Sequence, residues 1–304
     1  MVVANLDTRE INCENNEGVV VVIDPYSSGR FLVEELRRRE KKIVALRSTT
    51  DVTECLVAGY DPDAYHGAYD VPTDESPAQT AEYLKKTYGK IEAVFAGSEP
   101  GVILTDALNH ERGFKWNDHT TSELRRNKAL QQDRLRDCGV RAIKQLYSND
   151  IQEMLQFRRD HLEWPVVIKP PLSAATDGVY FCSNEQDVIE ACEANFGRMD
   201  ILGNVCDKVL IQEFLRGLEY VVDTMSRDGE HVLAAIWVYA KDCNLENGSI
   251  TYDNTELLPA TGEIQEQLID YMMSKGGVLD ALGIEYGPAH AEIMMTPTGP
   301  CLVE

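Results

Sequence analysis

The feature that most restricts how this chain can fold is its first regular segment, in which an apolar strand leads through a loop into an amphipathic helix. The run Val19 to Ile23 contains only valine and isoleucine, and the loop Asp24 to Gly29 joins it to the helical pattern GRFLVEELRRR. A second apolar run, Ile43 to Leu46, follows the helix. A short run that is apolar at every position is typical of a buried strand.

The same order recurs further along the chain. The strand Ile91 to Ala96 runs into the loop Gly97 to Gly101, and the helical stretch Val102 to Asn109 comes next. Strands that alternate with helices are joined by right-handed crossovers and form a parallel sheet. Ligands of such sheets gather where the strands end, so the loops 24–29 and 97–101 are the expected binding edge of an α/β domain over residues 1–115.

Beyond this domain the pattern changes to helices mixed with antiparallel strands. Residues 120–139 are helical in pattern, with Asp118 or Thr120 as N-cap. We predict a linker helix and a small α+β lobe over 116–212, and a larger antiparallel lobe over 213–304 that packs beside a helix from Ile264 to Leu282. The strands expected in the last third are Val209 to Glu213, Glu219 to Ser226, His231 to Ala240, His290 to Thr296 and Pro300 to Glu304.

Composition excludes several classes of partner. The 304 residues carry a formal net charge of -22, which opposes the broad basic surface that nucleic acids or anionic membranes require. Eight cysteines form no CxxC pair or compact zinc-binding set. The first residues are polar, and no apolar run approaches the ~20 residues of a membrane span. We therefore expect a cytoplasmic protein that binds neither nucleic acid nor membrane.

The first candidate binding feature is a lysine at the end of an apolar strand. Lys169 closes the run Val-Val-Ile-Lys, and a flexible stretch of small residues from Ser173 to Gly178 follows. The backbone amides of such a loop can fold over phosphate groups while the lysine supplies a positive charge. Taken alone, these residues are more typical of a surface lysine before an ordinary turn.

The second feature is a strand that ends in Gln-Glu-Phe-Leu. Glu213 and Phe214 follow an apolar run, and Glu219 comes six positions after Glu213. Backbone groups of this segment could bind a flat base, and Glu219 could accept hydrogen bonds from sugar hydroxyls. An ordinary strand, turn and strand would give the same pattern.

The third feature is a pair of glutamates on two strands joined by a Thr298-Gly299 hairpin. Glu292 and Glu304 each stand among apolar neighbours. Burying two facing carboxylates is unfavourable unless a cation lies between them, and shared Mg2+ would resolve the conflict. A solvated sheet face with two exposed glutamates is the alternative.

The order of the three features decides among these alternatives, because together they resemble the ATP-grasp superfamily. In detail the chain resembles the branch of amino-acid and other carboxylate–amine ligases, whose members carry segments like DPYSSGR, GSEPGV, LRRNK, VIKP, QEFLRGLEYVVD and GPAHAEIM in this order. The resemblance spans Val19 to Glu304. It implies an ATP-grasp fold of mixed α/β and α+β class, preceded by a Rossmann-like parallel-sheet domain.

The resemblance also implies a role for each matching residue in binding ATP. Lys128 and Lys169 match the two lysines that contact the nucleotide. Glu213 and Phe214 match the hinge that contacts adenine, and Glu219 matches the glutamate on the ribose side. The mobile loop that covers the phosphates corresponds to a stretch that includes Ser173, Thr176, Asp177 and Gly178.

Glu292 and Glu304 match the family's magnesium ligands, with Mn2+ as an alternative metal. In the implied reaction a small-molecule carboxylate attacks the γ-phosphate of ATP, and an amine, expected to be that of an amino acid, then displaces phosphate from the acyl phosphate. Family members usually continue past the second glutamate with an asparagine or small residue and then an arginine. The sequence stops at Glu304, so we expect a truncated lobe. The composition of the exposed face of the N-terminal domain would suit a homodimer.

Further candidate residues lie around this expected site. His290 and Lys241 are candidates for catalysis by orienting substrate or phosphate, and a structural histidine and a solvated lysine are the alternatives. Substrate contacts are expected from Ser27, Ser28 and Glu99. Ser28 begins a helix whose amides could bind a carboxylate, although a turn that only caps the helix would look the same.

Two other functions fit parts of the sequence. A nicotinamide-dependent oxidoreductase would use the N-terminal strand, loop and helix, but the loop reads DPYSSG instead of GxGxxG. A noncatalytic nucleotide-binding or regulatory protein of the same fold would keep the lysines and the hinge without turnover.

Overall fold

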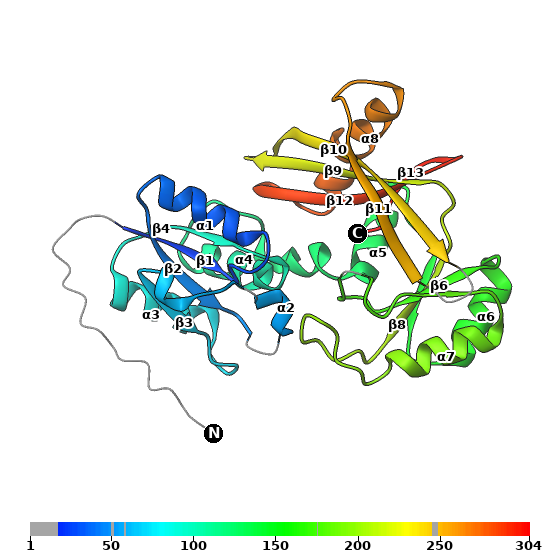
Figure 1. Ribbon diagram of the computed structural model, residues 1–304, viewed down its shortest axis with the longest axis horizontal. Coiled ribbons are helices and arrows are strands. Elements are labelled where there is room, and N and C mark those ends of the chain that lie inside the picture. Colours follow the sequence, from blue (N-terminus) through cyan, green and yellow to red (C-terminus); the bar gives the residue numbers. More distant parts are fainter. Residues whose placement is uncertain (1–17, 50–51, 58, 175, 245–248) are drawn as a thin grey trace. The chain divides into compact units, whose positions relative to one another are not determined.

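The computed structural model describes residues 18–49, 52–57, 59–174, 176–244 and 249–304. The chain divides into two compact units, Met1–Lys115 and Trp116–Glu304, and each is described by itself (Figure 1). Within the described ranges, every helix is too short or too polar to cross a membrane.

The first unit is a parallel sheet with strand order β3-β2-β1-β4, as the alternation of strands and helices predicts. Its strands are β1 (Val19–Ile23), β2 (Lys42–Arg47), β3 (Gly67–Asp70) and β4 (Ile91–Ala96). Its helices are α1 (Gly29–Arg38), α2 (Glu54–Val57), α3 (Pro77–Tyr88) and α4 (Val102–Glu111), with the 3-10 turns η1 (Pro62–Ala64) and η2 (Glu99–Gly101). The sequence pattern does not predict β3, whose four residues are too few to show a period.

Strand β1 is buried along its whole length because helices cover both faces of the sheet. Val19, Val21 and Ile23 pack in one cluster with residues of α3 and α4. Val20 and Val22 pack in another with residues of α1. Alternate residues of a strand point to opposite faces, so an unbroken apolar run fits a strand that is covered on both sides.

The loops after β1 and β4 touch at the carboxyl edge of this sheet. A Cβ atom on Gly29 would lie 2.3 Å from the Gly97 carbonyl oxygen, so neither a side chain nor a gap fits between them. Asp24 is buried, and its carboxylate accepts a hydrogen bond from the Ser48 amide at 2.8 Å. The Ser98 hydroxyl donates to the Asp24 carbonyl oxygen at 2.7 Å. The predicted binding edge is therefore a single packed layer of loops.

The second unit holds two antiparallel sheets, with strand orders β5-β8-β6-β7 and β11-β10-β9-β12-β13. The smaller sheet contains β5 (Gln145–Ser148), β6 (Val166–Lys169), β7 (Tyr180–Cys182) and β8 (Val209–Glu213). The larger contains β9 (Leu218–Arg227), β10 (Glu230–Asn244), β11 (Ser249–Leu257), β12 (Gly287–Thr296) and β13 (Gly299–Leu302). Helices α6 (Ile151–His161) and α7 (Glu185–Asn195) pack on the smaller sheet, and α8 (Glu263–Met273) and α9 (Val278–Ala281) on the larger.

Helix α5 (Lys128–Asp137) is tied to both sheets by buried side-chain amides. Gln132 donates to the Leu302 carbonyl oxygen at the end of β13, at 2.9 Å. Gln145 on β5 donates to the Ala129 carbonyl oxygen at 2.8 Å. Buried amides need partners, so these bonds fix the start of α5, and with it Lys128, between the two sheets.

Two predicted helices are in fact interrupted. The stretch 120–139 consists of the 3-10 helix η3 (His119–Arg125) and then α5, because the Asn127 side chain accepts hydrogen bonds from the Ala129 and Leu130 amides and starts a new helix. The stretch 264–282 breaks after Met273, where the Ser274 backbone is extended, and Gly276, with φ 79°, forms the turn that leads into α9.

Candidate functional site

One face of the larger sheet packs into the core, and the other carries polar side chains. Tyr220 and Val222 on β9 belong to the core with residues of α8 and α9, so the odd-numbered residues of β9 point to the opposite face. The antiparallel register places residues of β12 directly across from them, and directly opposed residues share a face. We call this side of the sheet the acidic face; its polar side chains on β9 and β12 are Glu219, Asp223, His290 and Glu292.

A β-bulge turns Glu304 toward the same face. Leu302 lies opposite Ile293 in the core, so in a regular strand Glu304 would also point into the core. Instead, the Glu292 carbonyl oxygen accepts hydrogen bonds from both the Val303 amide at 2.8 Å and the Glu304 amide at 3.4 Å. Two residues opposite one form a bulge, and the extra residue reverses the alternation.

Lys128 connects the small-residue loop to the acidic face. Its Nζ atom donates to the Ser173 carbonyl oxygen at 2.6 Å and to Glu304 Oε1 at 2.8 Å. Its side chain is 6% exposed, and its backbone amide donates to the Pro171 carbonyl oxygen at 2.9 Å. Lys128 and Glu304 are far apart in the sequence, and the fold brings them into direct contact.

Lys169 is a second buried cation at this site. It ends β6 and is 6% exposed. Burial, together with the positive charge of Lys128, lowers the pKa of Lys169 to about 8, while Glu304, Glu292 and Glu219 act in the opposite direction. The two lysines and three carboxylates therefore influence one another as a single electrostatic site, to which both sheets and α5 contribute.

The small-residue loop is anchored by Asp177. Its carboxylate accepts hydrogen bonds from the Ser173 hydroxyl at 3.0 Å, Arg198 Nη1 at 2.7 Å and the Ile201 amide at 3.1 Å. Burial would raise the pKa of Asp177, but these hydrogen bonds outweigh burial and lower it. The side chain predicted to lie near phosphate is thus engaged in holding the loop in place.

Two residues of this loop have left-handed backbone conformations. Thr176 has φ 62° and is exposed, and Gly178 has φ 76°. A Cβ atom at Gly178 would lie 2.5 Å from both Arg198 Nη2 and Asn195 Oδ1, so glycine is required there. Thr176 is exposed to solvent in the loop that Asp177 anchors.

Replacing Asp177 with asparagine is expected to loosen the loop without unfolding the protein, because charge-assisted hydrogen bonds worth on the order of 2 kcal/mol are lost. Since the folded-state pKa of Asp177 is lowered, the wild-type anchor is present above the unfolded pKa of about 4 and is lost as the pH falls through the folded pKa. Limited proteolysis at neutral pH should cut the variant faster within residues 170–178. Equal rates would contradict the anchor.

The segment after β8 is held by contacts on two sides. The Glu213 amide donates to the Lys144 carbonyl oxygen at 3.0 Å, and the Lys144 amide donates to Glu213 Oε1 at 2.9 Å. The Phe214 ring meets Phe181 edge-on, with 5.5 Å between ring centroids. Because the Glu213 carboxylate accepts the hydrogen bond from Lys144, a nucleotide base beside this hinge would contact the backbone groups of the hinge.

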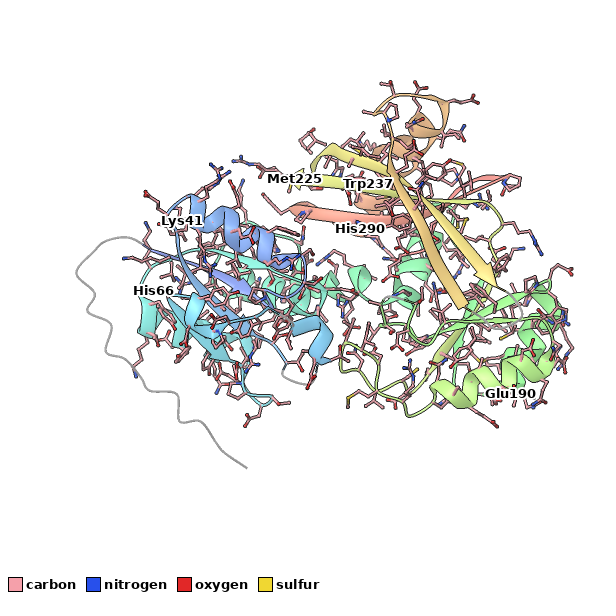
Figure 2. All side chains as sticks on the ribbon, in the orientation of Figure 1. Lys41, His66, Glu190, Met225, Trp237 and His290 are labelled. Atoms are coloured by element: carbon pink, nitrogen blue, oxygen red, sulfur yellow. The ribbon has the colours of Figure 1, made fainter. Side chains whose placement is uncertain are left out.

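Asp223 is a site residue that sequence reasoning missed. One carboxylate oxygen accepts a hydrogen bond from Trp237 Nε1 at 2.7 Å, and the other lies 2.7 Å from His290 Nδ1. Figure 2 labels Trp237 on β10 and His290 on β12. The spacing from Glu219 was the available clue, because residues four apart on a strand share a face.

The remaining predicted site residues are Lys241, Ser27, Ser28 and Glu99. Lys241 lies on β10, where its backbone pairs with Tyr252, and its side chain is outside the described residues. Ser27 and Ser28 are exposed, and Ser28 precedes α1 without a side-chain capping bond. Glu99 begins η2. Ser27, Ser28 and Glu99 belong to the first unit, and their part in substrate binding stays a prediction.

The acidic face suits a metal ion that is shared with phosphate. Among the described side chains, no three of the His, Cys, Asp or Glu type gather into a chelating set. Glu292 and Glu304 would leave most coordination positions of an ion to other oxygens. Mg2+ fits such a donor set, because it is usually held by one or two carboxylates together with phosphate oxygens and water.

Comparison with known proteins shows which family this chain resembles. The family described as "ATP-grasp domain" matches residues 162–304. Dapdiamide A synthase of Enterobacter agglomerans is 33% identical over 295 residues, which cover 95% of this chain and 67% of that protein.

Solved structures agree with this fold. An L-amino acid ligase from Bacillus licheniformis superposes with a TM-score of 0.72 at 18% identity, over 96% of this chain and 66% of that one. The biotin carboxylase domain of the Hydrogenobacter thermophilus 2-oxoglutarate carboxylase, solved with MgADP, superposes with a TM-score of 0.66 at 14% identity, over 95% of this chain and 64% of that one. The chain spans about two thirds of the length of these relatives.

These comparisons confirm the resemblance and the fold class that the motifs imply. The ATP-grasp match contains Lys169, Glu213, Glu292 and Glu304, and the similarity to Dapdiamide A synthase covers nearly the whole chain. The chain belongs to the ATP-grasp superfamily, in its branch of carboxylate–amine ligases.

Proposed function

We propose that this protein uses ATP to activate a carboxylate as an acyl phosphate and then joins the carboxylate to an amine as an amide. The observation that carries the proposal is the convergence of two buried lysines, Lys128 and Lys169, on the carboxylates of Glu219, Glu292 and Glu304. Phosphoryl transfer depends mainly on positioning and on neutralising charge at the phosphoryl oxygens. The two lysines and the carboxylates support both tasks, since the carboxylates would hold a metal ion.

The proposal assigns a task to each charged group. Lys169 neutralises phosphate from the end of β6. Lys128 exchanges its bond to Glu304 for a phosphate oxygen, which frees that carboxylate for the metal. Mg2+ held by Glu292 and Glu304, or Mn2+ in its place, would neutralise charge on the transferred phosphoryl group.

The rest of the nucleotide is assigned to the hinge and the loop. Backbone groups at Glu213 and Phe214 would contact adenine, and Glu219 would accept hydrogen bonds from the ribose. The loop that includes Ser173 and Thr176 would cover the phosphates. Exclusion of water matters, because an acyl phosphate exposed to solvent would hydrolyse before the amine arrives.

The names of two relatives, Dapdiamide A synthase and L-amino acid ligase, support an amino acid as one substrate. We assign Ser27, Ser28 and Glu99 to substrate contacts. A cytoplasmic setting is supported by the described cysteines, which are free thiols. Assembly as a homodimer stays a prediction.

Release of ADP and phosphate tests the proposal. With Mg-ATP and pools of amino acids, we expect release that requires two amino acids and produces a compound of the mass of their amide. Glu292→Gln should abolish release, because the amide replaces a charged metal ligand with a neutral one. Binding of ATP without release from any pool would instead identify a noncatalytic nucleotide-binding protein.

A further inference from the structure

Asp223 holds His290 in one orientation on the acidic face. His290 Nδ1 lies 2.7 Å from one oxygen of the Asp223 carboxylate. Trp237 Nε1 donates to the other oxygen at 2.7 Å, so the carboxylate is fixed on both sides. A carboxylate accepts hydrogen bonds and does not donate them, so the proton of the neutral imidazole resides on Nδ1. The lone pair is then on Nε2.

The second nitrogen of this ring is open to a ligand. The His290 side chain is 58% exposed. His290 and Glu292 are two residues apart on β12 and share the acidic face, which separates them by about 7 Å along the strand. The exposed edge of the ring therefore lies near the metal ligands, where the activated carboxylate and the incoming amine must meet.

A second histidine on the same sheet shows the contrast with a purely structural role. His231 Nδ1 lies 2.8 Å from the Ser226 hydroxyl, and His231 Nε2 lies 3.3 Å from Asp280 Oδ1. Both of its ring nitrogens are occupied, and its side chain is 6% exposed. His290 uses one ring nitrogen for a carboxylate contact of 2.7 Å, which is shorter than the 3.3 Å contact of His231, and its side chain is 58% exposed.

We propose that Asp223 is a positioning residue for the amine substrate. It holds His290 so that Nε2 accepts a hydrogen bond from an N–H group of the incoming amine. This inference rests on the proposed ligase function. The amine approaches the acyl carbon as a hydrogen-bond donor, so a fixed acceptor on the acidic face orients its nitrogen for attack. Trp237 contributes by preventing rotation of the Asp223 carboxylate.

Asp223→Asn tests this role through its effect on the two halves of the reaction. The asparagine amide can donate to Nδ1, which moves the ring proton to Nε2 and replaces the acceptor with a donor. With the amino-acid pool that supports ligation, kcat/KM for the amine should fall about ten- to hundredfold, the usual effect of losing a partner that orients a histidine. Hydroxamate formation from the carboxylate substrate, ATP and concentrated hydroxylamine should be unchanged, because a small, strong nucleophile needs no oriented site.

Asp280→Asn is the matched control, since it removes the carboxylate that contacts the buried side chain of His231. It should leave amide and hydroxamate formation at wild-type levels. Wild-type amide formation in Asp223→Asn would overturn the proposal. Equal loss of amide and hydroxamate would also overturn it, because that pattern indicates a structural role.

Nitrogen NMR of the six histidines tests the same inference without turnover, with His290 assigned from the signal missing in His290→Gln. We expect the proton on Nδ1 in the wild type and on Nε2 in Asp223→Asn. A wild-type proton on Nε2 would overturn the positioning role. Wild-type protein that forms no hydroxamate from any pool would contradict the ligase function instead, so the two failures are distinguishable.

Discussion

Replacing Lys169 with methionine is expected to raise the thermal stability of the ligand-free protein and to abolish its binding of ATP. Lys169 is buried, and its pKa falls from the ordinary 10.5 to about 8. The folded protein therefore holds this proton less tightly than the unfolded chain does, at a cost to folding on the order of 3 kcal/mol. Methionine has a similar volume and no charge, and replacing a buried charge by an apolar group of like size is often stabilising.

The pH dependence of this effect has a definite sign. Below the folded pKa of about 8, Lys169 is protonated in both states and opposes folding in full. Between about 8 and 10.5 the unfolded chain binds more protons, so the stability of the wild type rises with pH. The variant lacks the group, and its advantage should shrink over that range.

Melting temperatures at pH 7 and pH 10, with and without Mg-ATP, measure both effects. Lys169→Met should melt above the wild type at pH 7 and should show no rise with Mg-ATP, whereas a bound ligand raises the wild-type value. Lys275→Met is the control, because Lys275 is exposed and its loss should change neither quantity. A lower melting temperature for Lys169→Met at pH 7 would contradict the unfavourable burial of this cation.

Replacing Glu304 with glutamine should stop turnover while ATP still binds. Lys128 Nζ donates to Glu304 Oε1 at 2.8 Å, and the glutamine oxygen can accept the same bond, so the start of α5 should stay in place. The negative charge that would hold a metal is lost. Metal stabilisation of charge in the transition state is worth several kcal/mol, so kcat should fall at least about 10²-fold.

Lys128→Met should weaken ATP binding more than it slows turnover, because it removes the cation and leaves both carboxylates. We expect a weaker ATP dissociation constant, measured by calorimetry, as the first consequence. Glu230→Gln, at an exposed position of β10, controls for the loss of a glutamate. If Glu304→Gln weakened ATP binding as strongly as it slowed turnover, the assignment of Glu304 to the metal would be wrong.

The local features of the fold were accessible from the sequence. Strands β1, β4 and β8 have the predicted bounds, because apolar residues fill most of each run. The helices predicted over 120–139 and 264–282 failed where Asn127 caps a new helix and where the extended Ser274 precedes the turn at Gly276. A polar residue or a glycine within a periodic stretch is easily read as tolerated, although it can begin a new helix or form a turn.

The amino-acid sequence alone determined that β1 is covered on both sides, since Val19 to Ile23 has no polar face, and the order of its motifs determined the family. Tertiary structure decided how the site is assembled. The bulge opposite Glu292 turns Glu304 out of the core, the path of α5 brings Lys128 to Ser173 and Glu304, and the register of β9 with β12 pairs Asp223 with His290. Sequence periodicity reports which face of its own element a residue occupies, whereas contacts between distant residues depend on strand register and on how the sheets are joined, which no local pattern encodes.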